Sequence, residues 1–240
     1  FALIVKEGEN DIFRLPNDIL DTGKNKVVYE TKSTIGTDRT IDMKVSATHP
    51  GMAGGFMREV LTGISDDQQK NFLLDVLGKG IFQNMNLVEY KFENMNEISN
   101  PLLSKYSLNA KDYSDDLSEM LMFRVPYMNP IQSSPAILSK TRYNRLDLSA
   151  IGSLDPTVEK ITVNFPKGYS MIKLPADIIV KGKYGTYEVK FKQIKEGLYV
   201  EKYQTFSKTI IDQKEFDEFK EFYLKLLDVD KTKVLIQKTQ

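Results

Sequence analysis

The chain has 240 residues, with 33 basic and 33 acidic side chains, one histidine, and no cysteine or tryptophan. Its hydrophobic content of 41% and charged content of 28% are typical of a folded globular protein and exclude wholesale disorder. The absence of cysteine excludes disulfides and a cysteine nucleophile, one histidine excludes multi-histidine metal sites, and a net charge of zero without a basic stripe predicts no nucleic-acid partner.

Two segments with period-two alternation open the N-terminal part and predict a long β-hairpin. Val27, Tyr29 and Thr31 share one face of the first strand, and the second strand covers residues 41–47. The residues between them include Ile-Gly-Thr-Asp at positions 35–38, which is a turn signal.

Period 3.6 then replaces period two and predicts two short amphipathic helices. The second helix begins at a capping box, Ser65 with Gln68, and is expected to end at Gly78 and Gly80. The apolar stripe of the first helix is Met52, Phe56, Val60 and Ile64, widened by Met57 and Leu61. That of the second is Phe72, Leu73, Val76 and Leu77.

Strand character returns after the helices. Alternating apolar residues predict strands over 88–92, 102–108 and 121–125. Residues 126–156 contain four prolines and no sustained periodicity, so we expect a packed connection that could hide short edge strands. A strand over 161–165 then precedes a hairpin, 187–191 with 198–200, joined by Lys-Glu-Gly at 195–197.

The C-terminal part ends in a predicted helix and strand. A second capping box, Asp212 with Glu215, is expected to open the helix, and Val-Leu-Ile at 234–236 predicts the last strand. The helix has its apolar face at Phe216, Phe219, Tyr223, Leu226 and Leu227.

These elements predict an α+β fold that is mainly antiparallel and β-sandwich-like. A helix pair lies near the N-terminal part and one helix precedes the last strand. Short turns and the lack of strand–helix–strand repeats argue against a doubly wound parallel sheet. We expect two parts with a soft boundary, 1–95 for the hairpin, helix pair and returning strand, and 96–240 for the sandwich-like remainder. Both parts could share a sheet.

The segments that resemble chemical motifs are better explained by structure. His49, at a strand end, has no recognisable nucleophile or acid partner and is expected to be a partly exposed turn residue. The glycines of residues 51–55 lack the lysine and hydroxyl of a phosphate loop, so we expect a tight turn and close packing. Residues 228–232 lack the glycine and glutamate of a calcium loop. The sequence therefore predicts no catalytic residue, no metal site and no cofactor.

Acidic pairs and aromatic residues leave two binding or catalytic alternatives open. Asp66-Asp67 and Asp115-Asp116 are expected at the solvated surface unless two acids face each other across a cleft, as a carboxylate-based hydrolase requires. Tyr187, Tyr199 and Tyr203 on the predicted hairpin are candidate surface residues for a glycan or peptide ligand, although alternating aromatics on strands are more commonly core or cross-strand pairs.

Two features missing from the sequence bear on where the protein is located. No apolar run approaches the roughly 20 residues of a membrane-spanning helix, so we expect a soluble protein without a transmembrane segment. Because the chain opens at Phe1 rather than at methionine, we expect a processed or excised segment of a longer protein, with any targeting signal upstream.

Several sequence segments, in order, resemble one bacterial family. They are Gly-Met-Ala-Gly-Gly-Phe-Met-Arg at 51–58, Glu-Asn-Met-Asn-Glu at 93–97 with Pro101, residues 141–147, Phe-Pro-Lys-Gly-Tyr at 165–169 with Leu174 and Pro175, and the ending at 216–238. Together they resemble the β-rich region of unknown function that follows the transglutaminase-like, papain-fold domain in large exported proteins of Gram-negative bacteria.

The resemblance implies that the catalytic Cys, His and Asp lie in an upstream transglutaminase-like domain of the same polypeptide, in the periplasm or at the cell surface. The matching positions resemble turn and packing positions: Gly51, Arg58, Pro101, Gly168, Tyr169 and Pro175. We therefore expect a non-catalytic accessory region for domain packing or for presenting a partner or substrate. The alternative is a carbohydrate- or peptide-binding β-sandwich module.

Overall fold

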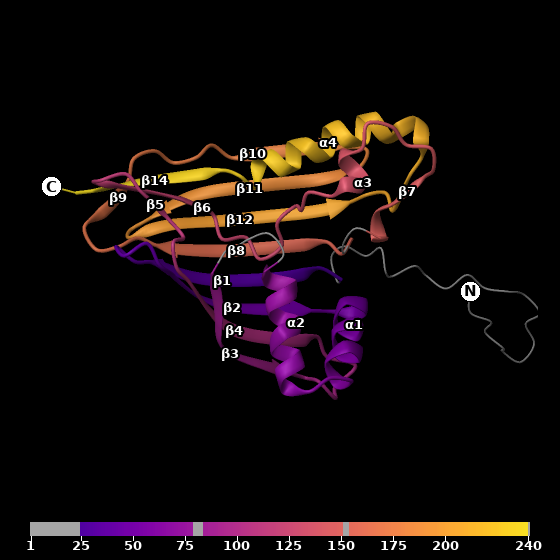
Figure 1. Cartoon of the computed structure of the whole chain (residues 1–240), viewed down its shortest axis with the longest axis horizontal. Coiled ribbons are helices and arrows are strands. Elements are labelled where there is room, and N and C mark those ends of the chain that lie inside the picture. Colours follow the sequence, from indigo (N-terminus) through magenta and orange to yellow (C-terminus); the bar gives the residue numbers. More distant parts are fainter. Residues whose placement is uncertain (1–24, 79–83, 151–153, 240) are drawn as a thin grey trace, which may run out of the picture.

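The computed structural model describes residues 25–78, 84–150 and 154–239, and its largest element is an eight-stranded sheet (Figure 1). The strands lie in the order β10-β11-β12-β8-β1-β2-β4-β3, and every neighbouring pair is antiparallel except β1 with β8. Their bounds are β1 Val27–Ile35, β2 Ile41–His49, β3 Met85–Glu93, β4 Leu102–Ala110, β8 Thr157–Asn164, β10 Ile178–Gly182, β11 Gly185–Ile194 and β12 Gly197–Phe206. The predicted antiparallel class and both hairpins are confirmed.

This sheet contains strands from both predicted parts of the chain. β4 lies between β2 and β3, and β8 pairs with β1 along its whole length. Hydrogen bonds of one continuous sheet therefore cross the boundary expected near residue 95. The division into 1–95 and 96–240 stays a prediction about the chain's organisation.

A second layer covers one face of the large sheet. It includes a four-stranded sheet in the order β5-β6-β14-β9, namely Asp115–Asp116, Met120–Arg124, Lys233–Lys238 and Tyr169–Met171. The short strands β7 (Leu146–Asp147) and β13 (Ile210–Ile211) pair with each other. Phe123 of β6 packs edge-on against Phe165 at the end of β8, with ring centroids 6.1 Å apart. The two layers share one hydrophobic core, which confirms the sandwich-like fold.

The helices lie in the same covering layer (Figure 1). α1 (Gly51–Thr62) and α2 (Asp66–Gly78) form the predicted pair and contact β2, β3 and β4. α4 (Phe216–Val229) precedes the last strand and packs on β10, with all five of its predicted apolar residues buried. A short helix, α3 (Pro135–Leu138), and a 3₁₀ turn (Leu148–Ala150) lie in the segment predicted as an irregular connection, as does strand β7.

The inner face of α1 differs from the predicted apolar stripe. Met52 and Phe56 are 67% and 62% exposed, and of the predicted stripe only Leu61 is buried. The other buried residues of the helix are Gly54 and Arg58. A side chain at Gly54 would place its Cβ about 2.4 Å from the His49 carbonyl oxygen, so glycine permits the helix to approach the sheet closely. Periodicity was wrong here because close backbone packing and a charged side chain occupy the inward positions.

Arg58 reaches the backbone of the connection between β3 and β4. Its Nε and Nη2 donate to the Asn94 carbonyl at 3.1 and 3.0 Å, and Nη2 also donates to the carbonyls of Glu97 and Asn100. Four donor contacts to a polar loop compensate for burying the guanidinium. The arginine therefore joins α1 to this loop.

The capping box predicted at the start of the C-terminal helix is wrong, although the helical segment does begin after Asp212. Asp212 makes no capping hydrogen bond, and residues Gln213–Glu215 form a 3₁₀ turn before the helix. Glu215 instead accepts hydrogen bonds from Lys208, whose hydrogen bond holds the pKa of the carboxyl below its usual range. At α2 the Ser65 amide does donate to the Gln68 side chain, at 2.9 Å. Gly80 and the side chains of Val76 and Leu77 lie outside the described residues.

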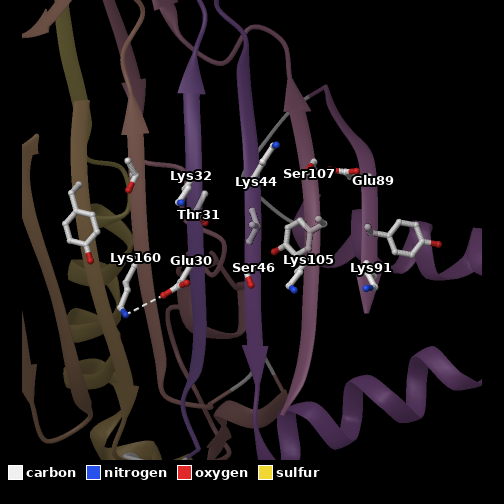
Figure 2. Close-up of a pocket in the computed structure, with 15 residues that line it drawn as sticks. Glu30, Thr31, Lys32, Lys44, Ser46, Glu89, Lys91, Lys105, Ser107 and Lys160 are labelled. Carbon is white, nitrogen blue, oxygen red and sulfur yellow. Dashed lines mark hydrogen bonds and ion pairs between the residues drawn. The ribbon is translucent and has the colours of Figure 1, made fainter. Parts of the chain in front are cut away.

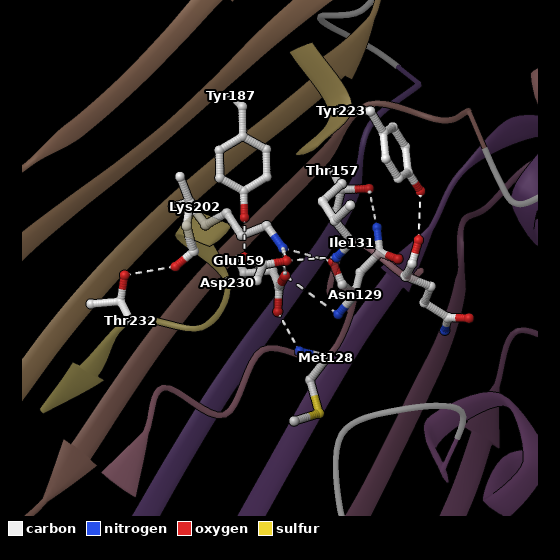
Figure 3. A network of polar contacts seen from close by, with 12 residues as sticks. Met128, Asn129, Ile131, Thr157, Glu159, Tyr187, Lys202, Tyr223, Asp230 and Thr232 are labelled. Atoms are coloured by element: carbon white, nitrogen blue, oxygen red, sulfur yellow. Dashed lines mark hydrogen bonds and ion pairs between the residues drawn. The ribbon is translucent and has the colours of Figure 1, made fainter. Parts of the chain in front are cut away.

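A network of buried charges joins the two layers (Figure 3). Lys202 of β12 and Glu159 of β8 face each other across the ladder, are both fully buried, and lie 3.0 Å apart. The Lys202 ammonium also donates to the Asn129 carbonyl at 2.7 Å and lies 3.6 Å from the Asp230 carboxylate. Asp230 follows α4 and accepts the Ile131 amide and the Tyr187 hydroxyl. Burial followed by the negative charge of Asp230 raises the pKa of Tyr187, which keeps its hydroxyl a donor.

Replacing Lys202 by methionine is expected to destabilise the protein strongly. The substitution leaves Glu159 and Asp230 buried without their cation, a change that costs about 3–5 kcal/mol of unfolding free energy. Urea denaturation at pH 7 measures this cost, with Lys190→Met as the control on the exposed face of β11. Adding Glu159→Gln to Lys202→Met should recover part of the loss. Equal stability of Lys202→Met and the wild type would contradict a structural role for the network.

His49 is buried rather than partly exposed, which corrects the prediction. Its Nε2 lies 2.9 Å from the Ser104 hydroxyl of β4, and its ring packs edge-on against Tyr29. Because β2 continues to residue 49, the histidine occupies an inward position of the strand instead of the turn. Burial lowers its pKa to about 4, so the ring is neutral at pH 7.

This lowered pKa makes the stability depend on pH. Below its ordinary pKa of about 6.5 the unfolded chain binds a proton that the folded ring does not take up until about pH 4, so folding weakens as pH falls through this window. The expected loss between pH 7.5 and pH 5 is about 2 kcal/mol. Urea titrations of the wild type and His49→Gln measure it as the difference between the two pH slopes. Identical slopes would contradict the burial.

Candidate functional site

A groove of about 660 Å³ crosses the face of the large sheet that no described helix or strand covers (Figure 2). Side chains on this outer face alternate with the buried ones along each strand, and those that form the two walls of the groove are polar or charged. The register assigns the fifteen lining residues to three rows that run across the strands. The middle row is Thr31, Val45, Tyr106 and Tyr90; one wall is Tyr199, Thr162, Lys32, Lys44, Ser107 and Glu89; the other is Lys160, Glu30, Ser46, Lys105 and Lys91.

The sheet geometry sets the dimensions of this groove. Its walls are two residues apart along each strand, or about 7 Å between Cα positions. It extends from β12 to β3, which is five strand spacings or about 24 Å. In the middle row, Thr31, Val45 and Tyr106 direct their side chains to the covered face, so backbone forms the floor. The result is a long open channel perpendicular to the strands.

The groove is positively charged although the whole chain is neutral. Five lysines and two glutamates line it. Lys32 of β1 and Lys44 of β2 face each other directly in the antiparallel register, and both are exposed. Within the described residues neither has an ion-pair or hydrogen-bond partner at its side chain. Like charges directly opposite each other destabilise a sheet, so this pair is unfavourable unless an anion lies between the two ammonium groups.

The other charged side chains of the groove already have partners. Lys160 lies 3.6 Å from Glu30, and Ser107 donates to Glu89 at 2.7 Å. Lys105 and Lys91 share Glu93, at 2.9 and 3.1 Å. Their hydrogen bonds, that of Lys105 first, hold the pKa of Glu93 below its usual range. The uncompensated positive charge is therefore greatest at Lys32 and Lys44, with a weaker excess at Lys105 and Lys91.

The three candidate tyrosines do not lie on one surface. Tyr199 is half-buried at the β12 end of the groove, and Tyr203 is half-buried on the same face outside it. Tyr187 lies on the covered face and is 0% exposed, hydrogen-bonded to Asp230. Including it among surface residues was wrong because β11 and β12 place positions 187 and 204 opposite each other on the inner side.

The remaining sequence candidates lie elsewhere and show no chemical site. Gly51 has a φ of +49° at the predicted tight turn, and Asp66 and Asp67 occupy the first turn of α2. Asp115 and Asp116 are exposed in β5. Across the described parts of the chain, no group of three histidine, cysteine or acidic side chains is placed to hold a metal ion. No helix among these residues is long and apolar enough to cross a membrane.

The groove is not recognisable in the sequence because its lysines are scattered over residues 32–160. Each occupies an outward position of a strand, and the signal lies in the pairing: lysines at alternating positions of strands that become neighbours. Pairing β1 with β8 and β2 with β4 joins segments far apart in the sequence, which periodicity alone does not reveal.

Comparison with known proteins gives one match. Residues 119–236, just under half of the chain, are similar to a family described as a "Domain of Unknown Function with solved-structure structure" (DUF3858). No curated protein and no solved structure matches the chain. The matching segment includes Lys202, Glu159 and Asp230 of the buried network, but of the groove lysines only Lys160. The family match therefore includes the buried network that joins the two layers. It does not include Lys32 and Lys44, where the positive charge of the groove is greatest.

Proposed function

We propose that the chain is a non-catalytic binding region whose groove holds an anionic partner. The observation that carries this proposal is the directly opposed, exposed Lys32–Lys44 pair, in which neither ammonium group has an ion-pair or hydrogen-bond partner among the described residues. A bound anion would remove the repulsion that the free protein carries there. The groove is open along its length, so a long ligand could enter from solvent.

A hydrolytic function fits the same groove less well. Its two carboxylates, Glu30 and Glu89, lie on opposite walls and three strands apart, or about 14 Å by strand spacing. Glycoside hydrolysis needs a separation of about 5–10 Å. Both glutamates also have partners, Lys160 and Ser107. A stacking platform for a glycan is limited to Tyr199 at one end, since the Tyr90 hydroxyl donates to the Asp66 carbonyl on the helix side.

As part of the proposal, the chain is an accessory region of a transglutaminase-like protein in the periplasm or at the cell surface. There it would present an anionic partner or substrate to that domain. Support comes from the sequence segments named above and from the lack of a cysteine nucleophile. The isolated chain is accordingly expected to have no amidase or transamidation activity, and measurable turnover would contradict the non-catalytic role.

Binding of polyanions tests the proposed function directly. The whole chain is titrated at low salt with fluorescently labelled poly-glutamate, polyphosphate and a sulfated polysaccharide. We expect at least one to bind, with an affinity that falls as salt screens the lysines. Lys32→Gln combined with Lys44→Gln should weaken it about tenfold or more.

The matched control is Lys190→Gln with Lys192→Gln, two exposed lysines of β11 on the same face but outside the groove. This variant removes the same charge and should bind nearly as the wild type does. No binding of any of the three polymers, or equal losses in the two double variants, would overturn the proposal.

A further inference from the structure

We propose that the ligand of the groove is an extended acidic peptide that lies across the strands, with acidic side chains three residues apart. This inference rests on the proposed function, since it names the ligand class of the same groove. It follows from the length of the groove, from the separation of its walls, and from the positions of the lysines on them.

The dimensions suit one extended polypeptide. A channel about 24 Å long accommodates about seven residues at the 3.3–3.4 Å rise of a β-strand. Walls about 7 Å apart leave room for a single backbone between two rows of side chains. Because successive side chains of an extended peptide point to opposite sides, they would meet the two walls alternately.

The lysines occur as two pairs on opposite walls. Lys32 and Lys44 lie on neighbouring strands β1 and β2 in one wall, and Lys105 and Lys91 lie on neighbouring strands β4 and β3 in the other (Figure 2). The centres of the two pairs are two strand spacings apart along the groove, or about 10 Å. Three residues of extended chain cover the same distance, and positions i and i+3 point to opposite sides. Acidic residues at i and i+3 would therefore contact both pairs at once.

The lining chemistry favours a peptide over other linear anions. Single-stranded nucleic acid and glycan chains are usually bound by stacking on aromatic rings, and this groove has one outward tyrosine, at its far end. Ser46, Ser107 and Thr162 each lie next to a lysine in the walls and supply hydroxyls suited to backbone amides and carbonyls. Glu30 and Glu89 lower the charge density, which suits a ligand with a few separated carboxylates better than a continuous polyanion.

Isomeric heptapeptides with blocked termini test the spacing. One carries glutamates at positions 3 and 6, the other at positions 3 and 5, in the same serine–glycine–threonine background, and both are titrated against the whole chain by calorimetry. We expect the 3,6 peptide to bind about fivefold more tightly, since only it can place a carboxylate on each wall. Lys44→Gln and Lys105→Gln, one from each wall, should each remove most of that preference, whereas Lys192→Gln should keep it.

Two readouts separate this inference from the proposed function and from misfolding. Lys44→Arg keeps the charge and should keep the preference, and thermal unfolding of Lys44→Gln should match or exceed that of the wild type, because the opposed cations are relieved. Equal affinity for the two isomers would overturn the peptide geometry. Binding of polyphosphate or the sulfated polysaccharide through Lys32 and Lys44, without binding of either peptide, would overturn the peptide and leave the anion-binding function standing.

Discussion

The fold depends on one buried ammonium group. Lys202 has three acceptors around it: the Glu159 carboxylate, the Asn129 carbonyl and the Asp230 carboxylate. The rings of Tyr127 and Tyr187 add cation–π contacts, with centroids 4.5 and 5.3 Å from Nζ. These partners come from the large sheet, from the connection after β6 and from the end of α4. A buried charge without such partners would be strongly unfavourable, so the segments that supply them must come together for the sandwich to form.

This constraint also explains why the described covering elements all lie on one face of the sheet. The network draws α4, the connection after β6 and strand β14 onto the inner side of β8, β11 and β12, and the Arg58 contacts hold α1 on the same side at β2 and β4. These helices, strands and connections therefore pack on the same face of the eight-stranded sheet. The lysines of the groove are held by strands whose inner side chains are packed, so their spacing is set before any ligand arrives. A prearranged spacing is what an interaction selective for positions i and i+3 requires.

Sequence periodicity predicted the elements well where apolar burial alone decided them, as in β2, β4, β11 and the apolar face of α4. It was wrong where another interaction took the inward position. Arg58 and Gly54 occupy the inner face of α1 because carbonyl groups and close packing favour them there. A bulge between Leu87 and Glu89 leaves Val88 68% exposed although it continues an apolar alternation. Glu159 and Lys202 lie at inward strand positions, and their cross-strand pairing, together with partners from the connection after β6 and from Asp230, makes these charges compatible with burial.

The candidate site was harder to predict because it depends on where the charged side chains lie. The amino-acid composition gives only their sum. Equal numbers of acidic and basic residues give a neutral chain, but the inward-facing network and the exposed groove separate the signs in space. The buried network has two carboxylates, Glu159 and Asp230, and one ammonium group, Lys202. The groove has five lysines and two glutamates. The potential near a surface depends on this local arrangement and not on the net charge. A neutral protein can therefore attract an acidic segment to one groove without attracting polyanions over its whole surface, which favours a specific partner over general electrostatic adhesion.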